Sequence, residues 1–318
     1  MKTINIMFLG GAKRVSLAEH FVKAGIQLGV KVNIFSYELS TYCPIASIGK
    51  VIVGKKWNDP DLLKDLMRII QEYNINIILP SVDPAIGCAA KLNVALGGKV
   101  FIPVSKEEIC NLMFDKKLAE NWFINNNIPI PQCYNHNDIF CFPVIIKPRK
   151  GSASQGIKVI ENIEDWAGVA NQDSYVIQQY IANKTEYTVD CYIAQNGDII
   201  SIVPRERLAV SGGEVMNSIT LHDEAMENIA SDILRKGNFR GPANVQFIKD
   251  NESGKVYVME VNPRFGGGVI TSIEAGADTP KFVLQEYLGQ AVQPCNNWKE
   301  KTLMTRYFKE VIFYADNH

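Results

Sequence analysis

Apolar positions recur with two different periods along the first hundred residues. The runs INIMFLG, VKVNIFSYE, INIILP and KVFIPVS are apolar and rich in β-branched residues, which predicts buried strands. Between them, residues 16–28 (SLAEHFVKAGIQL) and 60–73 (PDLLKDLMRIIQEY) carry apolar residues at helical spacing. Strands that alternate with helices predict βαβ units on a parallel sheet. We therefore predict an α/β, Rossmann-like domain over residues 1–104, with a loop after the strand that ends in Pro80.

The pattern changes in the second part of the chain. One helix is predicted over residues 106–125. The segments FPVIIKPRKGSASQGIKVI, EYTVDCYIAQNGDIISIVPRERL and ANVQFIKDNESGKVYVMEV then read as strands joined by turns, with QNGD and NESGK supplying turn residues. An α+β block with antiparallel sheet is therefore expected over about residues 105–290, and a late strand over residues 302–314.

Composition excludes several classes of protein. The 33 basic and 34 acidic side chains give a net charge of −1, which favours neither nucleic acid nor an anionic membrane as a partner. No segment reaches about 18 consecutive apolar residues. The seven cysteines include no C-x-x-C pair, which argues against a disulfide framework or zinc site and favours a cytoplasmic location. Cys110, Cys141 and Cys191 are expected to be small core residues.

Four oxygen-bearing side chains are predicted to gather on one face of a hairpin. Because side chains alternate faces along a strand, Glu260 and Asn262 point the same way. If Gln246 lies opposite Glu260, then Asn244 lies opposite Asn262, and residue 250 pairs with residue 256. The five residues left between them are an ordinary hairpin loop.

Such a polar cluster is costly to bury unless something satisfies it. Magnesium takes oxygen ligands and is usually completed by nucleotide phosphates, and Arg264, two residues beyond the cluster, can add positive charge against a phosphate. The alternative is a polar, solvent-facing side of the hairpin. That alternative does not account for the acid being followed by an amide, a proline, an arginine and three glycines in MEVNPRFGGG.

A glycine-containing loop offers a second candidate site. In IIKPRKGSASQGI, Lys147 stands at a strand end and is followed by small residues whose N–H groups can close over phosphate oxygens. The loop is neither a Walker A motif nor a dinucleotide G-x-G-x-x-G motif, and a mobile surface hairpin is the alternative. Upstream, FDKKLAE contributes Lys116, for which a solvated helix face is the alternative.

Taken in order, the helix lysine, the strand lysine with its glycine loop, QQYI, EYTVD, NVQF and MEVNPRFGGG resemble the ATP-grasp superfamily. The carbamoyl-phosphate synthase large-subunit branch is the nearest in pattern, and biotin carboxylase is a more distant cousin. The resemblance covers nearly the whole chain. It implies a pre-ATP-grasp domain over residues 1–104, a small lobe with a glycine-rich lid over 105–178, and a large lobe with a C-terminal tail over 179–318.

The resemblance also implies ATP and two Mg²⁺ ions as cofactors, with Mn²⁺ as a substitute. Lys116 and Lys147 would contact the phosphates, and residues 150–156 would act as a lid. Arg264 would stabilise an acyl-phosphate, and Glu186 would bind the ribose. Relatives often have an acid at the position of Gln179, so in this chain the contact with the ribose would rest on Glu186 alone. The remaining implied positions are Gly151, Ser152, Ser154 and Gly156 in the lid, Gln178, Gln179, Tyr180 and Ile181 in an adenine-binding hinge, Gln246, Glu260 and Asn262 as magnesium ligands with Asn244 beside them, and Arg205 and Arg207 near the transferred phosphate or the substrate.

The implied activity is that of an ATP-dependent carboxylate–amine ligase that works through an acyl-phosphate and releases ADP and phosphate. Its partners would be a small carboxylate and an amine, and relatives suggest a homodimer. One unit of 318 residues is not expected to run the full carbamoyl-phosphate synthase sequence, which joins two ATP-grasp halves to a glutaminase. Three alternatives stay open: activation of bicarbonate, ATP binding without chemistry, and an NAD-dependent dehydrogenase with Glu38 as the ribose ligand.

The second substrate is expected between the domains. Arg14 in GGAKR and Asp83 in PSVDP follow two N-terminal strands, where ligands of parallel sheets bind. A helix N-terminus after Gly11 could hold an anion, and Asp83 could meet an amine. Ordinary βα turns are the alternative for both.

Overall fold

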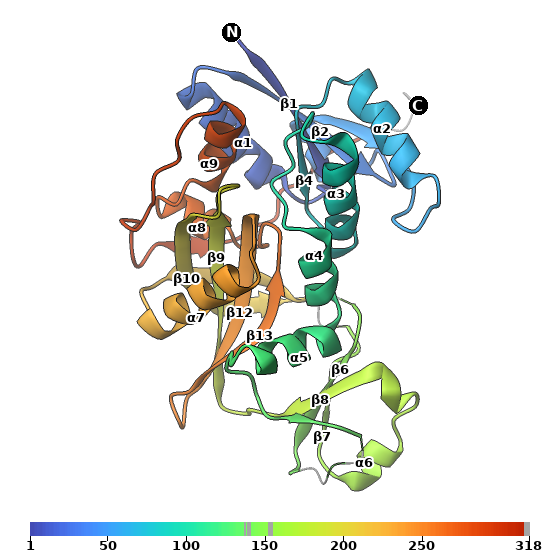
Figure 1. The fold of residues 1–318 in the computed structure, drawn as a ribbon, viewed down its shortest axis with the longest axis vertical. Helices are drawn as coiled ribbons and strands as arrows, with labels where there is room; N and C mark the ends of the chain where they lie inside the picture. Colours follow the sequence, from blue (N-terminus) through green and yellow to red (C-terminus); the bar gives the residue numbers. More distant parts are fainter. Residues whose placement is uncertain (137, 139–140, 152–154, 315–318) are drawn as a thin grey trace.

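The computed structural model describes residues 1–136, 138, 141–151 and 155–314. These residues form three sheets that follow one another along the long axis of the molecule (Figure 1). The N-terminal sheet lies at one end, a six-stranded sheet lies in the middle, and a small four-stranded sheet lies at the other end. Within these residues no helix is both long and apolar enough to cross a membrane.

The N-terminal sheet is parallel and is covered by helices on both faces. Ile6 and Phe8 pack on one face against helices α1 and α9, while Met7 and Leu9 pack on the other face against α2 and α3. One covering helix therefore comes from the C-terminal third of the chain. The strand order is β3-β2-β1-β4, and the elements are β1 (Thr3–Leu9), α1 (Val15–Gln27), β2 (Lys31–Glu38), η1 (Pro44–Ser47), β3 (Lys50–Val53), α2 (Leu62–Glu72), β4 (Ile77–Pro80), α3 (Asp83–Leu96) and α9 (Thr279–Tyr287).

Two predictions for this region need correction. The run KVFIPVS is not a strand: Phe101 forms a single parallel bridge with Ile77, and Pro103 has no N–H with which to continue the pairing. The loop predicted after Pro80 is short, because helix α3 begins at Asp83 with a proline in its first turn. Proline is well tolerated at that position of a helix.

The single helix predicted over residues 106–125 is two helices, α4 (Glu107–Phe114) and α5 (Lys116–Asn125). The residue between them, Asp115, is extended, and its carboxylate accepts the main-chain N–H groups of Lys117 and Leu118. An aspartate that caps a helix in this way starts a new helix where periodicity alone would continue the old one. Lys116 consequently occupies the first turn of α5.

The small sheet is antiparallel, as the hairpin pattern predicted, with strand order β5-β8-β6-β7. Val144, Ile146, Ile177 and Trp166 form its core. Its elements are β5 (Cys133–Tyr134), β6 (Val144–Pro148), β7 (Lys158–Ile160), α6 (Ile163–Ala167), η2 (Gln172–Ser174) and β8 (Tyr175–Gln179). The expectation that Cys141 is a core residue is wrong, because it is exposed in the segment before β6; Cys110 and Cys191 are buried as predicted.

The central sheet has strand order β13-β12-β9-β10-β11-β14. Val245, Phe247 and Val258 face helix α7 in one core, which leaves the opposite face of β12 and β13 to their polar residues. The late strand covers only Leu303–Thr305 and not the predicted residues 302–314. The elements are β9 (Lys184–Ile193), β10 (Ile199–Ser211), β11 (Glu214–Thr220), α7 (Glu224–Lys236), β12 (Gly241–Asp250), β13 (Val256–Asn262), α8 (Ile270–Glu274) and β14 (Leu303–Thr305).

The register of the β12–β13 hairpin matches the prediction at its polar end. Asn244 pairs with Asn262 and Gln246 pairs with Glu260. A bulge then shifts the register by one residue, so that Lys249 pairs with Val256, and the predicted pair between residues 250 and 256 is wrong. Bulges of this kind re-aim side chains near functional sites, and this one directly adjoins Glu260.

Candidate active site

Lys147 is a buried lysine on β6 of the small sheet, 6% exposed. Its Nζ donates to Oε1 of Gln178 on β8, at 2.8 Å. Burial, opposed by the Glu260 carboxylate and assisted by the nearby Lys116, lowers the pKa of Lys147 to about 8. The electrostatic effect of Glu260 on Lys147 indicates that the small sheet and the central sheet lie near each other at this point.

The sequence analysis did not identify the buried carboxylate that holds the other side of the Gln178 amide. Glu120 on α5 is 3% exposed and lies 3.5 Å from Nε2 of Gln178. Its other oxygen accepts from Nζ of Lys117 at 2.6 Å. The spacing of Lys117 and Glu120 in FDKKLAE is that of neighbours on a helix, which was the available signal. This series of hydrogen bonds, from Lys117 through Glu120 to Gln178, fixes the Gln178 amide and therefore the position of the Lys147 ammonium group.

Lys116 ties helix α5 to the glycine loop. Its Nζ donates to the main-chain oxygen of Gly151 at 2.8 Å, and its N–H donates to that of Arg149 at 2.9 Å. Asp115 also accepts two bonds from the Arg149 guanidinium, at 2.7 and 2.8 Å. Gly151 and Gly156 have φ angles of +126° and +73°, which glycine adopts readily. The predicted lid residues Ser152 and Ser154 lie outside the described residues.

The predicted metal ligands converge on one face of β12 and β13. Nδ2 of Asn262 donates to Oε1 of Glu260 at 2.9 Å and to Oδ1 of Asn244 at 3.3 Å, so Oδ1 of Asn262 can serve as a ligand. Asn244 is buried, and its Nδ2 donates to the main-chain oxygen of Arg264 at 3.2 Å. Asn244 therefore braces the end of β13, while Gln246, Glu260 and Asn262 remain as the donor set.

This donor set fits magnesium bound to a nucleotide. Gln246, Glu260 and Asn262 supply hard oxygen atoms but only one negative charge. Within the described residues no cluster of three or more His, Cys, Asp or Glu side chains could hold a metal by itself. A divalent ion at this face would therefore need phosphate oxygens to complete its ligands, which is the usual arrangement for Mg²⁺.

The two arginines of β10 have different surroundings. Arg205 is 2% exposed, and its Nε donates to Oδ2 of the buried Asp190 at 2.8 Å. A Cβ at Gly268 would lie 2.7 Å from Nη1 of Arg205, so this arginine supports the glycine segment after β13. Arg207 donates to Oε1 of Gln246 at 3.1 Å and therefore lies on the polar face of the sheet.

The predicted adenine hinge is engaged by other parts of the protein. The N–H of Gln179 donates to the main-chain oxygen of Gln132 at 2.8 Å, and the main-chain oxygen of Ile181 accepts from Nζ of Lys184 at 3.0 Å. Tyr180 lies beneath the Lys184 ammonium group, 4.7 Å from its ring centroid. The Glu186 carboxylate, 44% exposed, lies 3.6 Å from the Arg207 guanidinium. These contacts leave Glu186 accessible at the edge of the site.

Asp83 and Arg14, the two residues predicted to bind the second substrate, both contact the segment that follows β13. Arg264 donates from Nε to Oδ1 of Asp83 at 2.6 Å, and both side chains are at most 15% exposed. Nη1 of Arg14 donates to the main-chain oxygen of Gly266 at 3.3 Å. Burial, followed by the nearby Arg264 guanidinium, lowers the pKa of Arg14 to about 10. Arg306, which sequence reasoning missed, donates to the main-chain oxygen of Gly267.

The loop after β1 is closed by the chain's own carboxylate. The N–H groups of Gly11 and Ala12 and the hydroxyl of Ser36 donate to Glu38. Glu38 thus fills the position at which an external anion was expected, and it is also the residue that a dehydrogenase would use for the cofactor ribose. This arrangement counts against the dehydrogenase alternative.

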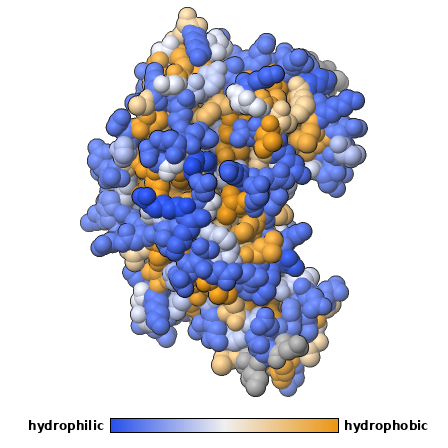
Figure 2. All heavy atoms as spheres, in the orientation of Figure 1, coloured by the Kyte–Doolittle hydropathy of each residue, from blue (hydrophilic) through white to orange (hydrophobic). Residues whose placement is uncertain are grey.

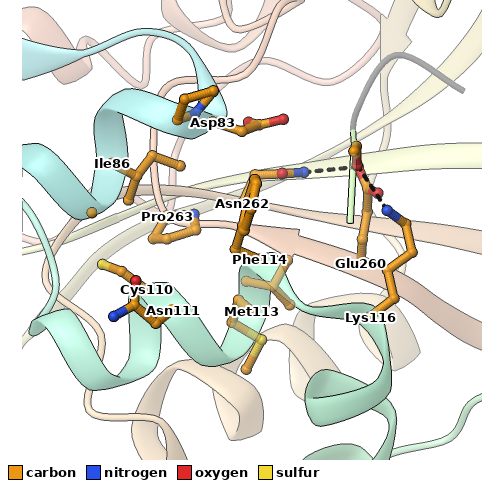
Figure 3. Close-up of a pocket in the computed structure, with 14 residues that line it drawn as sticks. Asp83, Ile86, Cys110, Asn111, Met113, Phe114, Lys116, Glu260, Asn262 and Pro263 are labelled. Atoms are coloured by element: carbon orange, nitrogen blue, oxygen red, sulfur yellow. Dashed lines mark hydrogen bonds between the residues drawn. The ribbon is translucent and has the colours of Figure 1, made fainter. Parts of the chain in front are cut away.

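A pocket of about 170 Å³ opens beside the proposed metal ligands. Glu260 and Asn262 line it from β13, Lys116 lines it from α5, and Asp83 lines it from the start of α3 (Figure 3). The space-filling view shows the molecule narrowed alongside α4, between the N-terminal part and the small sheet, with hydrophobic residues reaching the surface there (Figure 2).

Residues 171–310 match the family model described as "ATP-grasp in the biosynthetic pathway with Ter operon". The carbamoyl phosphate synthase large chain of Methanobrevibacter smithii is 24% identical over 276 residues, which cover 76% of this chain and 26% of that protein. The D-alanine–D-alanine ligase of Petrotoga mobilis is 27% identical over 183 residues, which cover 50% of this chain and 59% of that protein. The chain thus spans about a quarter of the first relative and somewhat less than two thirds of the second.

Solved structures share the fold. The biotin carboxylase domain dimer of the Hydrogenobacter thermophilus 2-oxoglutarate carboxylase, in complex with MgADP, ADP and bicarbonate, superposes with a TM-score of 0.76 at 14% identity. The match covers 94% of this chain and 73% of that one. The N5-carboxyaminoimidazole ribonucleotide synthetase from Thermotoga maritima superposes with a TM-score of 0.69 at 16% identity, covering 95% of this chain and 79% of that one.

Proposed function

We propose that this chain, which belongs to the ATP-grasp superfamily as the order of its motifs predicted, is an ATP-dependent ligase that joins a carboxylate to an amine. One observation carries the proposal. Lys116 on α5 lines the same pocket as Glu260 and Asn262 of the central sheet, and the buried Lys147 on the small sheet is near enough to Lys116 and Glu260 for both to affect its pKa. A lysine and an oxygen-donor face thus border one volume with a second lysine nearby, and a magnesium-bound triphosphate would satisfy all three.

The proposed reaction has two steps. An oxygen of the substrate carboxylate attacks the γ-phosphorus of ATP, the bond from that phosphorus to the bridging oxygen breaks, and ADP leaves with the electron pair. The amine nitrogen then attacks the acyl carbon of the acyl-phosphate, the bond to the phosphate oxygen breaks, and the nitrogen loses a proton. Phosphoryl transfer of this kind depends on alignment and on charge neutralisation.

The residues of the site have separate tasks in this proposal. Gln246, Glu260 and Asn262 would hold magnesium, which supplies positive charge beside the phosphates. Lys147, fixed by Gln178, would neutralise a phosphate oxygen. Arg264 would face the acyl-phosphate while Asp83 orients the arginine.

Hydroxylamine offers a direct test, because it replaces the amine and converts an acyl-phosphate into a stable hydroxamate. The purified protein is incubated with MgATP, hydroxylamine and one carboxylic acid at a time, and ADP and hydroxamate are measured together. We expect acid-dependent ADP and hydroxamate in equal amounts, and neither product from Lys147→Met. If no acid in a broad panel stimulates ADP release by the folded protein, the proposal is refuted.

Activation of bicarbonate is the second candidate function. It is supported by the similarity to carbamoyl phosphate synthase and by the shared fold with a biotin carboxylase domain that was crystallised with bicarbonate. The same assay distinguishes the two candidates when it is run in bicarbonate-free buffer with and without added bicarbonate. ADP release that depends on bicarbonate alone would favour this second function.

A further inference from the structure

The pocket beside the proposed metal ligands has an apolar interior. Ile86 from α3, Cys110, Met113 and Phe114 from α4, and Pro263 after β13 form its wall (Figure 3). Ile86, Cys110 and Met113 are buried in the cores on either side, so this wall is fixed by packing. A site that held only ions and phosphates would not need such a surface.

The polar end of the same pocket coincides with the proposed site of phosphoryl transfer. Lys116, Glu260 and Asn262 line it, as does the lid residue Gly151. The hinge residues 178–181 are not among the described residues that line it, so the nucleotide base would lie elsewhere. A molecule in the pocket would therefore present its polar end to the γ-phosphoryl group and its body to the apolar wall.

We infer that the carboxylate substrate carries an apolar group of about the size of a benzene ring, seated against Ile86, Cys110, Met113 and Phe114; this inference rests on the proposed function. The pocket of about 170 Å³ includes its polar end, so its apolar part has room for at most one group of this size, because an apolar cavity of about 150 Å³ holds benzene. Lys116 is the cation at the mouth, and it would attract the carboxylate toward the metal face. Bicarbonate has no group to fill the apolar part.

Helix α3 offers two positions for testing this inference: one where a substitution narrows the pocket, and one that serves as a matched control. Gly87 on α3 lines the pocket, and a Cβ placed on it would lie 3.3 Å from Oδ1 of Asn111, whose exposed side chain would have to shift slightly. Gly87→Leu would therefore extend into the pocket, and replacing glycine within a helix favours folding. Val94→Leu lies on the same helix at a position that is 78% exposed. Phe114→Ala, at a residue that is 38% exposed, would enlarge the pocket.

The experiment measures kcat/KM for hydroxamate formation with acetate, 3-methylbutanoate, phenylacetate and succinate. Because hydroxylamine replaces the amine in every reaction, differences in kcat/KM between acids reflect how the site binds the acid. We expect kcat/KM to rise by about 10-fold or more for each methylene that enters the apolar part, and succinate to be poor. Gly87→Leu should lower the value for phenylacetate by at least about 10-fold while sparing acetate. Val94→Leu should change neither value, and Phe114→Ala should extend activity to larger acids.

The inference is overturned, with the proposed function intact, if acids are turned over without regard to apolar size or if succinate is preferred. It is also overturned if Gly87→Leu affects all acids equally. If no acid releases ADP, binding of 4-fluorophenylacetate measured by fluorine NMR separates the two claims. Binding to the wild type that Gly87→Leu abolishes would support the pocket assignment while the proposed function fails. The absence of binding would overturn the pocket assignment as well.

Discussion

The affinity for MgATP should depend on pH through Lys147. Burial, with Lys116 nearby, lowers the pKa of this lysine from 10.5 to about 8, which corresponds to about 3 kcal/mol against the charged form. A triphosphate binds the charged form. Affinity should therefore be fully present well below pH 8 and should fall as the pH rises through that value. With a pKa of about 8, roughly nine in ten molecules carry the charge at pH 7 and roughly one in ten at pH 9.

The apparent Kd for a non-hydrolysable MgATP analogue should accordingly rise about 10-fold between pH 7 and pH 9. Isothermal titration calorimetry measures this dependence, and buffers of different ionisation enthalpy should reveal proton uptake on binding above pH 8. Lys147→Met should bind more weakly and with little dependence on pH. A flat profile for the wild-type protein, or the same slope in Lys147→Met, would refute the assignment of this lysine to the phosphates.

Three further predictions concern the polar face and the motif after β13. Glu260→Gln removes the one carboxylate of the donor set and should lower ATP turnover by about 100-fold or more at unchanged thermal stability. Mutation of residues that only hydrogen-bond to metal ligands already lowers metal affinity or activity by about 10–100-fold, so loss of a ligand should cost at least as much. Asp83→Ala leaves the half-buried Arg264 without its ion-pair partner, and urea denaturation should show a loss of about 2 kcal/mol in the free energy of unfolding that is not repeated in the Asp83→Ala/Arg264→Ala double variant. Gly268→Ala places a Cβ 2.5 Å from Cγ1 of Val215 and 2.7 Å from Nη1 of Arg205, and it should lower both the melting temperature and the activity; unchanged activity would contradict the support that Arg205 gives to this segment.

The polar end of the β12–β13 hairpin could be predicted because it depends on local rules. Strand alternation and loop length bring Gln246 opposite Glu260 and Asn244 opposite Asn262, and both pairs are present. The bulge next to Glu260 could not be read in the same way, because one extra residue in a strand leaves no signal in the alternation of side chains or in the turn residues. Local patterns therefore gave the donor set but not the full register.

Features that depend on tertiary packing were missed or only half predicted. Asp83 and Arg264 were each candidates, but their ion pair joins residues 181 positions apart and no local pattern records it. Asp115 interrupts a continuous helical pattern through a capping contact, which propensity alone does not predict. Glu120 was not singled out in the sequence, and it is the packing of the small sheet against α5 that buries it beside Gln178.

The apolar pocket also could not be predicted from local sequence patterns. Cys110 and Met113 lie three residues apart on α4, the spacing expected of core residues, and Ile86 lies on α3; two separate cores bury the three side chains. They line a pocket because α3, α4 and the end of β13 meet beside the donor set. That meeting is a property of the assembled fold and not of any one segment.

A crystal structure with Mn²⁺ and a non-hydrolysable ATP analogue would test the central claim most directly, because it needs no knowledge of the acid or the amine. We predict anomalous density for Mn²⁺ among Gln246, Glu260 and Asn262, with the terminal phosphate facing Lys147, and we predict that Glu260→Gln loses this density. Metal and triphosphate bound elsewhere on the protein, with these side chains unliganded, would contradict the account.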